Sequence, residues 1–319
     1  MTGIPGSVAL CVVSLGGNAL IRRGERGTIE EQFDHARSCM KQISTMVEKG
    51  YKVVITHGNG PIVGNIVLRN EAAKNTVPPM PLYICDADSE GGIGYMLQQT
   101  IYNHLRGMRY SGEVATVITQ VVVDKDDQAF RNPTKPIGPF YSGEEALAVE
   151  REKGWKFVED SGRGYRRVVP SPRPKKVIEA AVIRKLCALG VIVIAAGGGG
   201  VPVIELGNGN LQGVDAVVDK DLSTSLLARE IDAELFINLT QVDMVSLNYG
   251  KPDQEGLRDV SLADIKKYFE RGHFPPGSMG PKIEAAVEFL EAGGKEVIIT
   301  SPERMEDALQ GRAGTRIHA

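Results

Sequence analysis

The segment VALCVVSLGGNAL, Val8–Leu20, decides how this chain folds. Its first eight residues are nearly all apolar, and Gly16, Gly17 and Asn18 follow at once. A short apolar run that ends in glycines is typical of a buried strand of a parallel sheet that enters a tight loop. We therefore predict a strand over Val8–Leu15 with a glycine loop at its carboxyl end.

The same pattern returns at two further points of the chain, after the apolar-rich runs Lys52–His57 and Val191–Ala196. In open α/β sheets, ligands bind beyond the carboxyl ends of the strands. Glycine there lets the backbone approach a ligand and point several N–H groups at one anion. One such cluster also fits an ordinary tight turn, but three at three strand ends indicate a phosphate site assembled from several loops. The two further loops consist of Gly58, Asn59 and Gly60, and of Gly197, Gly198, Gly199 and Gly200.

Short apolar runs alternate with longer helical stretches along the rest of the chain. This alternation predicts a largely parallel sheet flanked by helices. Further strands are expected at Val114–Val123, Leu235–Leu239 and Glu296–Thr300. Helices are expected at Ile29–Lys49, from Ser89 as a cap to Arg106, from Pro174 at a first helical position, and at Asp219–Glu230, Leu262–Arg271 and Met279–Ala292.

The character of the sequence changes between about Asp124 and Pro174. This stretch is rich in proline, glycine and charge, shows poor periodicity and holds the only tryptophan, Trp155. A structureless loop of that length is uncommon in a compact domain. We therefore predict one α/β domain over residues 1–319, with residues 124–174 inserted in it as a lid subdomain.

The composition argues against several classes of protein. A net charge of −3 disfavours a broad surface for nucleic acid or anionic membrane, which needs a clear excess of Lys and Arg. No secretion signal and no apolar run of about 18 residues is visible. The cysteines at positions 11, 39, 85 and 187 lack metal-site spacing. They are expected as buried thiols in a reducing compartment, so we expect a cytoplasmic protein.

Familiar catalytic signatures are missing from the sequence. GxxxxGK(S/T) does not occur and no GxGxxG follows the first strand, which excludes a P-loop and gives a dinucleotide-binding fold little support. The HRD and DFG motifs of protein kinases are absent, and no Ser-His-Asp or metal-ligand constellation is visible. His57 lies at a strand end beside a glycine loop, and a structural role is expected for it.

An ordered set of motifs runs along nearly the whole chain, from about Val8 to Ile317. The set consists of SLGGNAL (14–20), THGNGP (56–61), NPTKPIGPF (132–140), RVVPSP (167–172), AGGGGVP (196–202), VDKDL (218–222), NYGKPDQ (248–254) and GSMGPK (277–282). SLGGNAL resembles the opening loop of the amino acid kinase superfamily, and the ordered set resembles the carbamate kinases.

This resemblance implies a fold, a reaction and an assembly. The fold is a three-layer αβα sandwich with a mainly parallel central sheet and a protruding lid subdomain. The reaction is reversible phosphoryl transfer between carbamoyl phosphate with ADP and carbamate with ATP. Mg²⁺ would be held mainly by the nucleotide phosphates, with no protein metal ligands expected. A homodimer, and ATP generation in arginine or purine-nitrogen breakdown, are the further family expectations.

The resemblance also assigns roles to individual residues. Lys135 would reach the substrate, and Lys220 and Lys282 would touch the transferred phosphoryl group and the nucleotide phosphates. Asp221 would orient these lysines. Ser278 is expected to cap a helix, so that helix N–H groups and Lys282 face one phosphate. The implied phosphate- and substrate-binding residues are Gly16, Gly17, Asn18, Gly58, Asn59 and Gly60, and the implied nucleotide-binding residues are Gly197, Gly198, Gly199, Asp243, Tyr249 and Met279.

Two segments depart from the family pattern. The usual Cys-Gly-Ala-Met-Ser-Gln is Cys-Asp-Ala-Asp-Ser-Glu at 85–90. Its carboxylates are expected to be favourable charges at a helix N-terminus, and the alternative is an altered substrate or subunit contact. The usual Thr-Asp-Val-Asp is Thr-Gln-Val-Asp at 240–243, and a frequent tyrosine is replaced by Ser246. Nucleotide affinity or base preference is expected to depend on these changes.

Two other functions stay open at this point. The first is a related phosphotransferase of the same superfamily that acts on a different carboxylate or phosphate. The second is a non-catalytic sensor of nucleotide or carbamoyl phosphate. Retention of all three lysines and of Asp221 favours an enzyme over a sensor.

Overall fold

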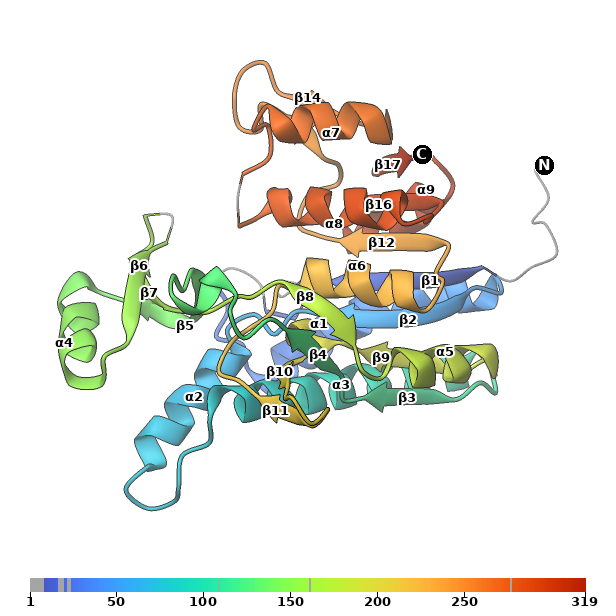
Figure 1. Cartoon of the computed structure of the whole chain (residues 1–319). Coiled ribbons are helices and arrows are strands. Elements are labelled where there is room, and N and C mark those ends of the chain that lie inside the picture. The colour runs from blue at the N-terminus through green and yellow to red at the C-terminus, as the bar shows by residue number, and fades with distance from the viewer. Residues whose placement is uncertain (1–8, 17–19, 22–23, 109, 161, 276) are drawn as a thin grey trace.

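The computed structural model describes residues 9–16, 20–21, 24–108, 110–160, 162–275 and 277–319 (Figure 1). Within them, the central sheet has eight strands in the order β15-β17-β16-β12-β1-β2-β9-β3. All neighbours pair in parallel except β16 and β17. These strands are β1 (Leu10–Leu15), β2 (Lys52–His57), β3 (Val114–Val117), β9 (Ile192–Ala195), β12 (Leu235–Leu239), β15 (Asp259–Ser261), β16 (Glu296–Thr300) and β17 (Thr315–His318).

Helices cover both faces of this sheet because successive strand residues point to opposite sides. On β1, Val12 belongs to one apolar core, whereas Cys11 and Val13 belong to the other. The first core is covered by α5 (Ala180–Ala188), α6 (Lys220–Glu230), α7 (Leu262–Glu270) and α8 (Met279–Glu291). The second is covered by α1 (Ile29–Glu48), α3 (Leu82–Gly107) and α9 (Met305–Leu309). This is the predicted three-layer α/β arrangement, and that prediction is confirmed.

The predicted strand Val114–Val123 is wrong, because the run divides between two sheets. β3 ends at Val117, and β4 (Gln120–Val123) begins a smaller sheet in the order β11-β10-β4-β8. Thr119 holds the bend, since its N–H donates to Glu90 Oε2 at 3.1 Å and its hydroxyl donates to the Val117 carbonyl at 2.7 Å. The other strands of this sheet are β8 (Pro174–Val177), β10 (Val201–Glu205) and β11 (Leu211–Gly213).

Two predicted helix starts are also wrong. α3 begins at Leu82 after Pro81, and Ser89 is buried inside it, with its hydroxyl donating to the Asp86 carbonyl at 2.8 Å. Proline interrupts regular backbone hydrogen bonding, and Pro81 precedes Ser89 in the chain. Pro81 therefore marks the true start of this helix. Pro174 begins a strand instead of a helix, and α5 starts only at Ala180. The remaining predicted helices and strands match the structure to within about two residues, except that Val8 lies outside the described residues.

The segment between β4 and β8 carries a sheet of its own, which projects to the left in Figure 1. Its order is β5-β7-β6, with β5 (Lys135–Tyr141), β6 (Lys156–Glu159), β7 (Tyr165–Val169) and the helix α4 (Gly143–Lys153). It rests on α2 (Ile62–Ala73) at a very close approach: a Cβ on Gly64 would lie 2.1 Å from the Gly138 Cα. Glycine is required at Gly64 for this contact. Whether the segment moves as a lid stays a prediction.

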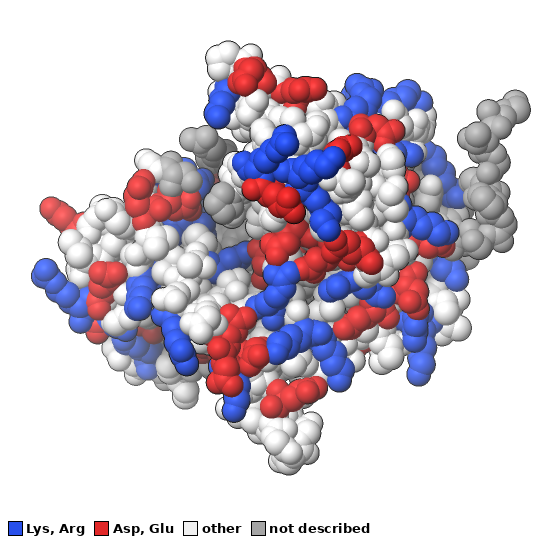
Figure 2. Space-filling view, turned by 45° about the horizontal axis from the view of Figure 1, so that its top comes forward, with Lys and Arg blue, Asp and Glu red and all other residues white. Residues whose placement is uncertain are grey.

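Surface and interior agree with a globular chain of small net charge. All four cysteines are buried, as predicted. Figure 2 shows acidic and basic side chains interspersed over one face. Among the residues that the structure describes, no helix combines the length and the apolarity that crossing a lipid bilayer requires.

Candidate active site

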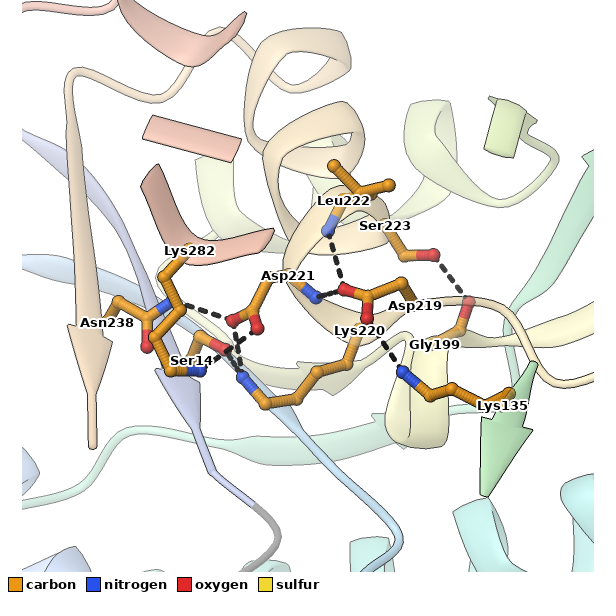
Figure 3. Close-up of polar contacts among 10 residues, drawn as sticks. All are labelled: Ser14, Lys135, Gly199, Asp219, Lys220, Asp221, Leu222, Ser223, Asn238 and Lys282. Atoms are coloured by element: carbon orange, nitrogen blue, oxygen red, sulfur yellow. Dashed lines mark hydrogen bonds and ion pairs between the residues drawn. The ribbon is translucent and has the colours of Figure 1, made fainter. Parts of the chain in front are cut away.

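The N-terminus of α6 lies beside the carboxyl end of β1, and the predicted lysines gather there (Figure 3). Asp219 caps the helix, since its Oδ1 accepts from the N–H groups of Asp221 at 2.9 Å and Leu222 at 3.4 Å. Lys220 and Asp221, the first two helical residues, are thereby fixed in orientation. Aspartate is among the best N-caps because its side chain replaces a partner that the first turn of a helix lacks.

Asp221 is the centre of the polar network in Figure 3. Its Oδ1 accepts from Lys220 Nζ at 2.6 Å and from Asn238 Nδ2 at 2.7 Å, and its Oδ2 accepts from Lys282 Nζ at 3.0 Å. Lys220 Nζ also donates to Ser14 Oγ at 3.0 Å. Side chains from α6, β12 and α8 therefore converge on one carboxylate, and Ser14 of β1 joins them through Lys220.

Burial sets the charge states in this network. It lowers the pKa of Lys220 to about 8, helped by the nearby ammonium of Lys282 and opposed by Asp221. Burial alone would raise the pKa of Asp221, but the charges of Lys220 and Lys282 outweigh it and hold the pKa well below its usual value. Asp221 is therefore ionised throughout the neutral range.

Lys135 reaches the same place from the projecting sheet. Its Nζ lies 2.7 Å from Asp219 Oδ2, although 84 residues separate the two in sequence. All three lysines singled out from the sequence therefore pair with the two aspartates of the Asp-Lys-Asp motif. An arrangement of three ammonium groups around two carboxylates carries a surplus positive charge, which suits the binding of phosphate oxygens.

The third glycine loop is buried and packs on the second. Gly197 N–H donates to Glu90 Oε1 at 2.9 Å, and the Gly199 carbonyl accepts from Ser223 Oγ at 2.7 Å. A Cβ on Gly197 would lie 2.3 Å from His57 Nε2, and one on Gly198 would lie 2.9 Å from Asn59 Nδ2. These glycines therefore allow the two loops to pack closely. Nucleotide binding by Gly197, Gly198 and Gly199 stays a prediction.

The first two loops are described in part. The Gly58 N–H donates to the Leu15 carbonyl at 2.9 Å, and the Gly16 N–H donates to the Leu239 carbonyl at 3.2 Å. Gly60 has a φ of 50°, a conformation that few other residues adopt. The predicted binding residues Gly17 and Asn18 lie outside the described residues.

The other predicted nucleotide residues are Asp243, Tyr249 and Met279. Asp243 Oδ1 accepts from Ser301 Oγ at 2.6 Å, so this carboxylate is held in place. Tyr249 is 61% exposed and Met279 is the first residue of α8. The predicted cap at Ser278 is wrong: its backbone precedes the helix, but its side chain accepts no capping hydrogen bond. Lys282 therefore lies one turn into a helix whose first turn has no side-chain cap.

A buried acidic pair, Asp86 and Glu90, was not singled out as functional by sequence. Asp86 is the fifth residue of α3, so the explanation as favourable charge at a helix N-terminus is wrong. Burial raises the pKa of Glu90 to about 8, and burial together with Glu90 and Asp215 raises the pKa of Asp86 well above its usual value. Neither oxygen of Asp86 has a hydrogen-bond partner among the described residues.

His57 has the structural character expected from the sequence. It is fully buried, its Nδ1 lies 3.2 Å from the Gly58 carbonyl, and burial lowers its pKa to about 4. The ring is therefore neutral near pH 7, with the proton on Nδ1. Its Nε2 faces the third glycine loop.

Comparison with known proteins identifies the class that this fold and site define. Residues 9–301 match the model of the amino acid kinase family. A carbamate kinase of Pyrococcus furiosus is 51% identical over 308 residues, which cover 96% of this chain and 98% of that protein. A carbamate kinase structure from Giardia lamblia bound to citric acid has a TM-score of 0.93 at 43% identity, covering 98% of this chain and 99% of that one. Another Giardia structure, bound to AMP-PNP, has a TM-score of 0.90 at 44% identity with the same coverage.

The chain belongs to the amino acid kinase family. Within that family its place is among the carbamate kinases, because the likeness to them spans nearly the full length of both chains. The resemblance inferred from the ordered motifs is thereby confirmed.

Proposed function

We propose that this protein is a carbamate kinase. It catalyses reversible phosphoryl transfer between carbamoyl phosphate with ADP and carbamate with ATP. The observation that carries the proposal is the convergence of Lys135, Lys220 and Lys282 on the aspartates at the N-terminus of α6. The full-length likeness to carbamate kinases supports this substrate over the other carboxylates and phosphates used by the superfamily.

The chemistry fits a site that is rich in lysines. Carbamate is already an oxyanion, so its attack on a phosphoryl group needs no proton removal. The remaining tasks are alignment and neutralisation of charge on the transferring oxygens. Lys220 and Lys282 perform the second task, Asp221 holds both ammonium groups in place, and Lys135 binds the carbamoyl phosphate.

Adenine nucleotide binding is part of this proposal. The AMP-PNP complex of the Giardia relative supports it. The nucleotide would lie along α8, with its phosphates toward Lys282 and its base near Tyr249 and Met279. Gly16, Gly17, Asn18, Gly58, Asn59 and Gly60 would surround the carbamoyl phosphate and the transferred phosphoryl group.

Magnesium belongs to the proposed reaction as a partner of the nucleotide phosphates. The two site carboxylates do not form a free ligand set for it, because Asp219 and Asp221 already accept from lysines, Asn238 and backbone N–H groups. Within the described residues, no group of three or more His, Cys, Asp or Glu side chains is placed to hold a metal ion. Most of its ligands would therefore be phosphate oxygens and water.

A homodimer in a reducing, cytoplasmic environment completes the proposal. β3 is an edge strand of the central sheet, and the adjoining surface of α3 exposes Tyr95 and Tyr102, with Ile118 beside Gly91. An edge strand and exposed apolar side chains are features that proteins usually cover. The burial of the four cysteines agrees with reducing conditions. Light scattering should give twice the mass of one chain, and Tyr95→Lys should shift it toward the monomer.

The decisive experiment is ATP formation by the purified protein from carbamoyl phosphate and MgADP. Parallel assays in the reverse direction, with carbamate, acetylglutamate, uridylate and isopentenyl phosphate, distinguish the related phosphotransferases. Turnover of another substrate but not of carbamoyl phosphate would replace the proposed reaction. Binding of MgADP by calorimetry without any turnover would instead indicate a sensor.

A further inference from the structure

Asp219 makes two kinds of contact with its two oxygens (Figure 3). Oδ1 caps α6 through the N–H groups of Asp221 and Leu222. Oδ2 accepts from Lys135 Nζ at 2.7 Å. The residue that starts the helix bearing Lys220 is therefore also the docking point of a lysine on the projecting sheet.

The charges around Asp219 show why Lys135 needs this partner. Asp221 already pairs with both Lys220 and Lys282. A third ammonium group brought to the same place is repelled by the other two unless an anion accompanies it. Burial alone would raise the pKa of Asp219, but Lys135 together with Lys220 lowers it, so the carboxylate is ionised and attracts Lys135.

The connection between Asp219 and Lys135 also links two parts of the fold. Lys135 is the first residue of β5, where it pairs with Val169 of β7 in the three-stranded sheet. Asp219 adjoins Lys220 in the chain. The ion pair of Lys135 with Asp219 thus connects the projecting sheet to the residue next to Lys220.

We propose that Asp219 is a positioning residue, which holds the Lys135 ammonium group at the phosphate site before carbamoyl phosphate binds. The inference rests on the proposed function for its effect on turnover. Its structural part, the coupling of Lys135 to Asp219, does not. The charge of Asp219 acts through Lys135 and not through the helix cap.

The test separates these two contributions of Asp219 by one substitution. Asp219→Asn keeps the cap, because asparagine caps helices as well as aspartate does, and removes the charge that holds Lys135. We expect kcat to fall about 10- to 100-fold, as when a catalytic ammonium group is misplaced, while the KM for MgADP changes less than about twofold. In a Lys135→Met background, Asp219→Asn should lower kcat no further.

A matched control uses another ion pair of the projecting segment. Lys153 Nζ lies 2.9 Å from Glu71 Oε2 and joins α4 to α2, away from the phosphate site. Glu71→Gln loosens the segment without touching the cluster around Asp219, and kcat should stay within about twofold of the original enzyme. A loss in Glu71→Gln equal to that in Asp219→Asn would mean that general anchoring matters, and would overturn the positioning role.

Hydrogen exchange supplies a readout that needs no turnover. Without ligand, the amides of residues 135–141 should exchange faster in Asp219→Asn, and to the same degree in Lys135→Met. This measurement decides the question if Lys135→Met is too slow to assay or if the proposed reaction is absent. The proposal is overturned by unchanged exchange in Asp219→Asn, by a normal kcat in that variant, or by an equal loss of kcat with and without Lys135.

Discussion

Glu90 Oε1 accepts a hydrogen bond of 2.9 Å from the Gly197 amide and so joins the middle of α3 to the third glycine loop. Its Oε2 accepts from the Thr119 amide at 3.1 Å. In the ionised carboxylate form, both oxygens of Glu90 can accept these hydrogen bonds. Burial nevertheless raises the pKa of Glu90 to about 8, because it favours the neutral form. The glycine loop is thus held by a group whose charge changes near physiological pH.

Glu90 should make stability fall as the pH rises. A folded-state pKa raised from 4.5 to about 8 means that the favourable contribution is complete below about pH 4.5 and is lost as pH approaches 8. The free energy of unfolding of the original protein minus that of Glu90→Gln should therefore decrease by roughly 2–4 kcal/mol between pH 5 and 8.5. Urea unfolding across this range measures it. Exposed Glu48→Gln is the control, and parallel curves for Glu90→Gln and the original protein would refute the assignment.

Lys220 should act on the transition state more than on substrate binding. Removing one preorganised donor to a developing oxyanion lowers kcat by about two to three orders of magnitude. The kcat of Lys220→Ala should therefore fall by this amount, with a smaller change in KM. Steady-state assays in the ATP-forming direction measure both constants. Lys295→Ala, at an exposed lysine paired with Glu234, should remain fully active. Full activity of Lys220→Ala would remove this lysine from the mechanism.

The pH dependence of kcat/KM should report the charge of Lys220. Its pKa in the free enzyme is lowered to about 8, so the protonated fraction falls above that pH. We expect kcat/KM to be level below about pH 7.5 and to decline about tenfold per pH unit well above 8. Lys220→Arg, which cannot lose its proton in this range, should abolish that decline whatever its absolute rate. An identical alkaline decline in Lys220→Arg would assign it to another group.

The projecting segment should be protected by substrates if it acts as a lid. Exchange of the amides in residues 132–140 should slow when MgADP and a carbamoyl phosphate mimic are added, because closure hides the backbone from water. Val123 and Pro174 are ladder partners, so a short linker can replace residues 124–173. The shortened protein should lose turnover yet retain MgADP binding. Exchange that is unaffected by ligand, or normal turnover without the segment, would exclude a lid.

Local signals explain which parts of the fold were predictable. The strands β2, β12 and β16 were predicted residue for residue, because each is a short apolar run with clear ends. The start of α3 was misplaced, since Ser89 looks like a cap only when its burial is unknown. Pro174 fits a helix start and an edge strand equally well, and the pairing with β4 that decides between them involves residues about 50 positions earlier.

The candidate site shows the same limit at the level of side chains. Lys135, Lys220, Lys282 and Asp221 were found because they lie in recognisable motifs. The pairing of Lys135 with Asp219 was not foreseen, because it joins residues 84 positions apart. Glu90 was noticed only as a departure from a pattern. Its bonds to Thr119 and Gly197 depend on how α3 packs against the sheet, which no local spacing reveals.

The neighbouring positions of Val123 and Pro174 have an evolutionary consequence. The intervening stretch leaves the main α/β domain and returns to it at adjacent points, and we predict that it can be exchanged as a unit. Under the proposed roles, this stretch carries Lys135, which contacts the phosphate acceptor. Lys220 and Lys282 belong to the main α/β domain. Acceptor choice and phosphoryl chemistry are then encoded in separable parts of the gene. A lineage could change its substrate by replacing about fifty codons, and the catalytic lysines of the main α/β domain would stay the same.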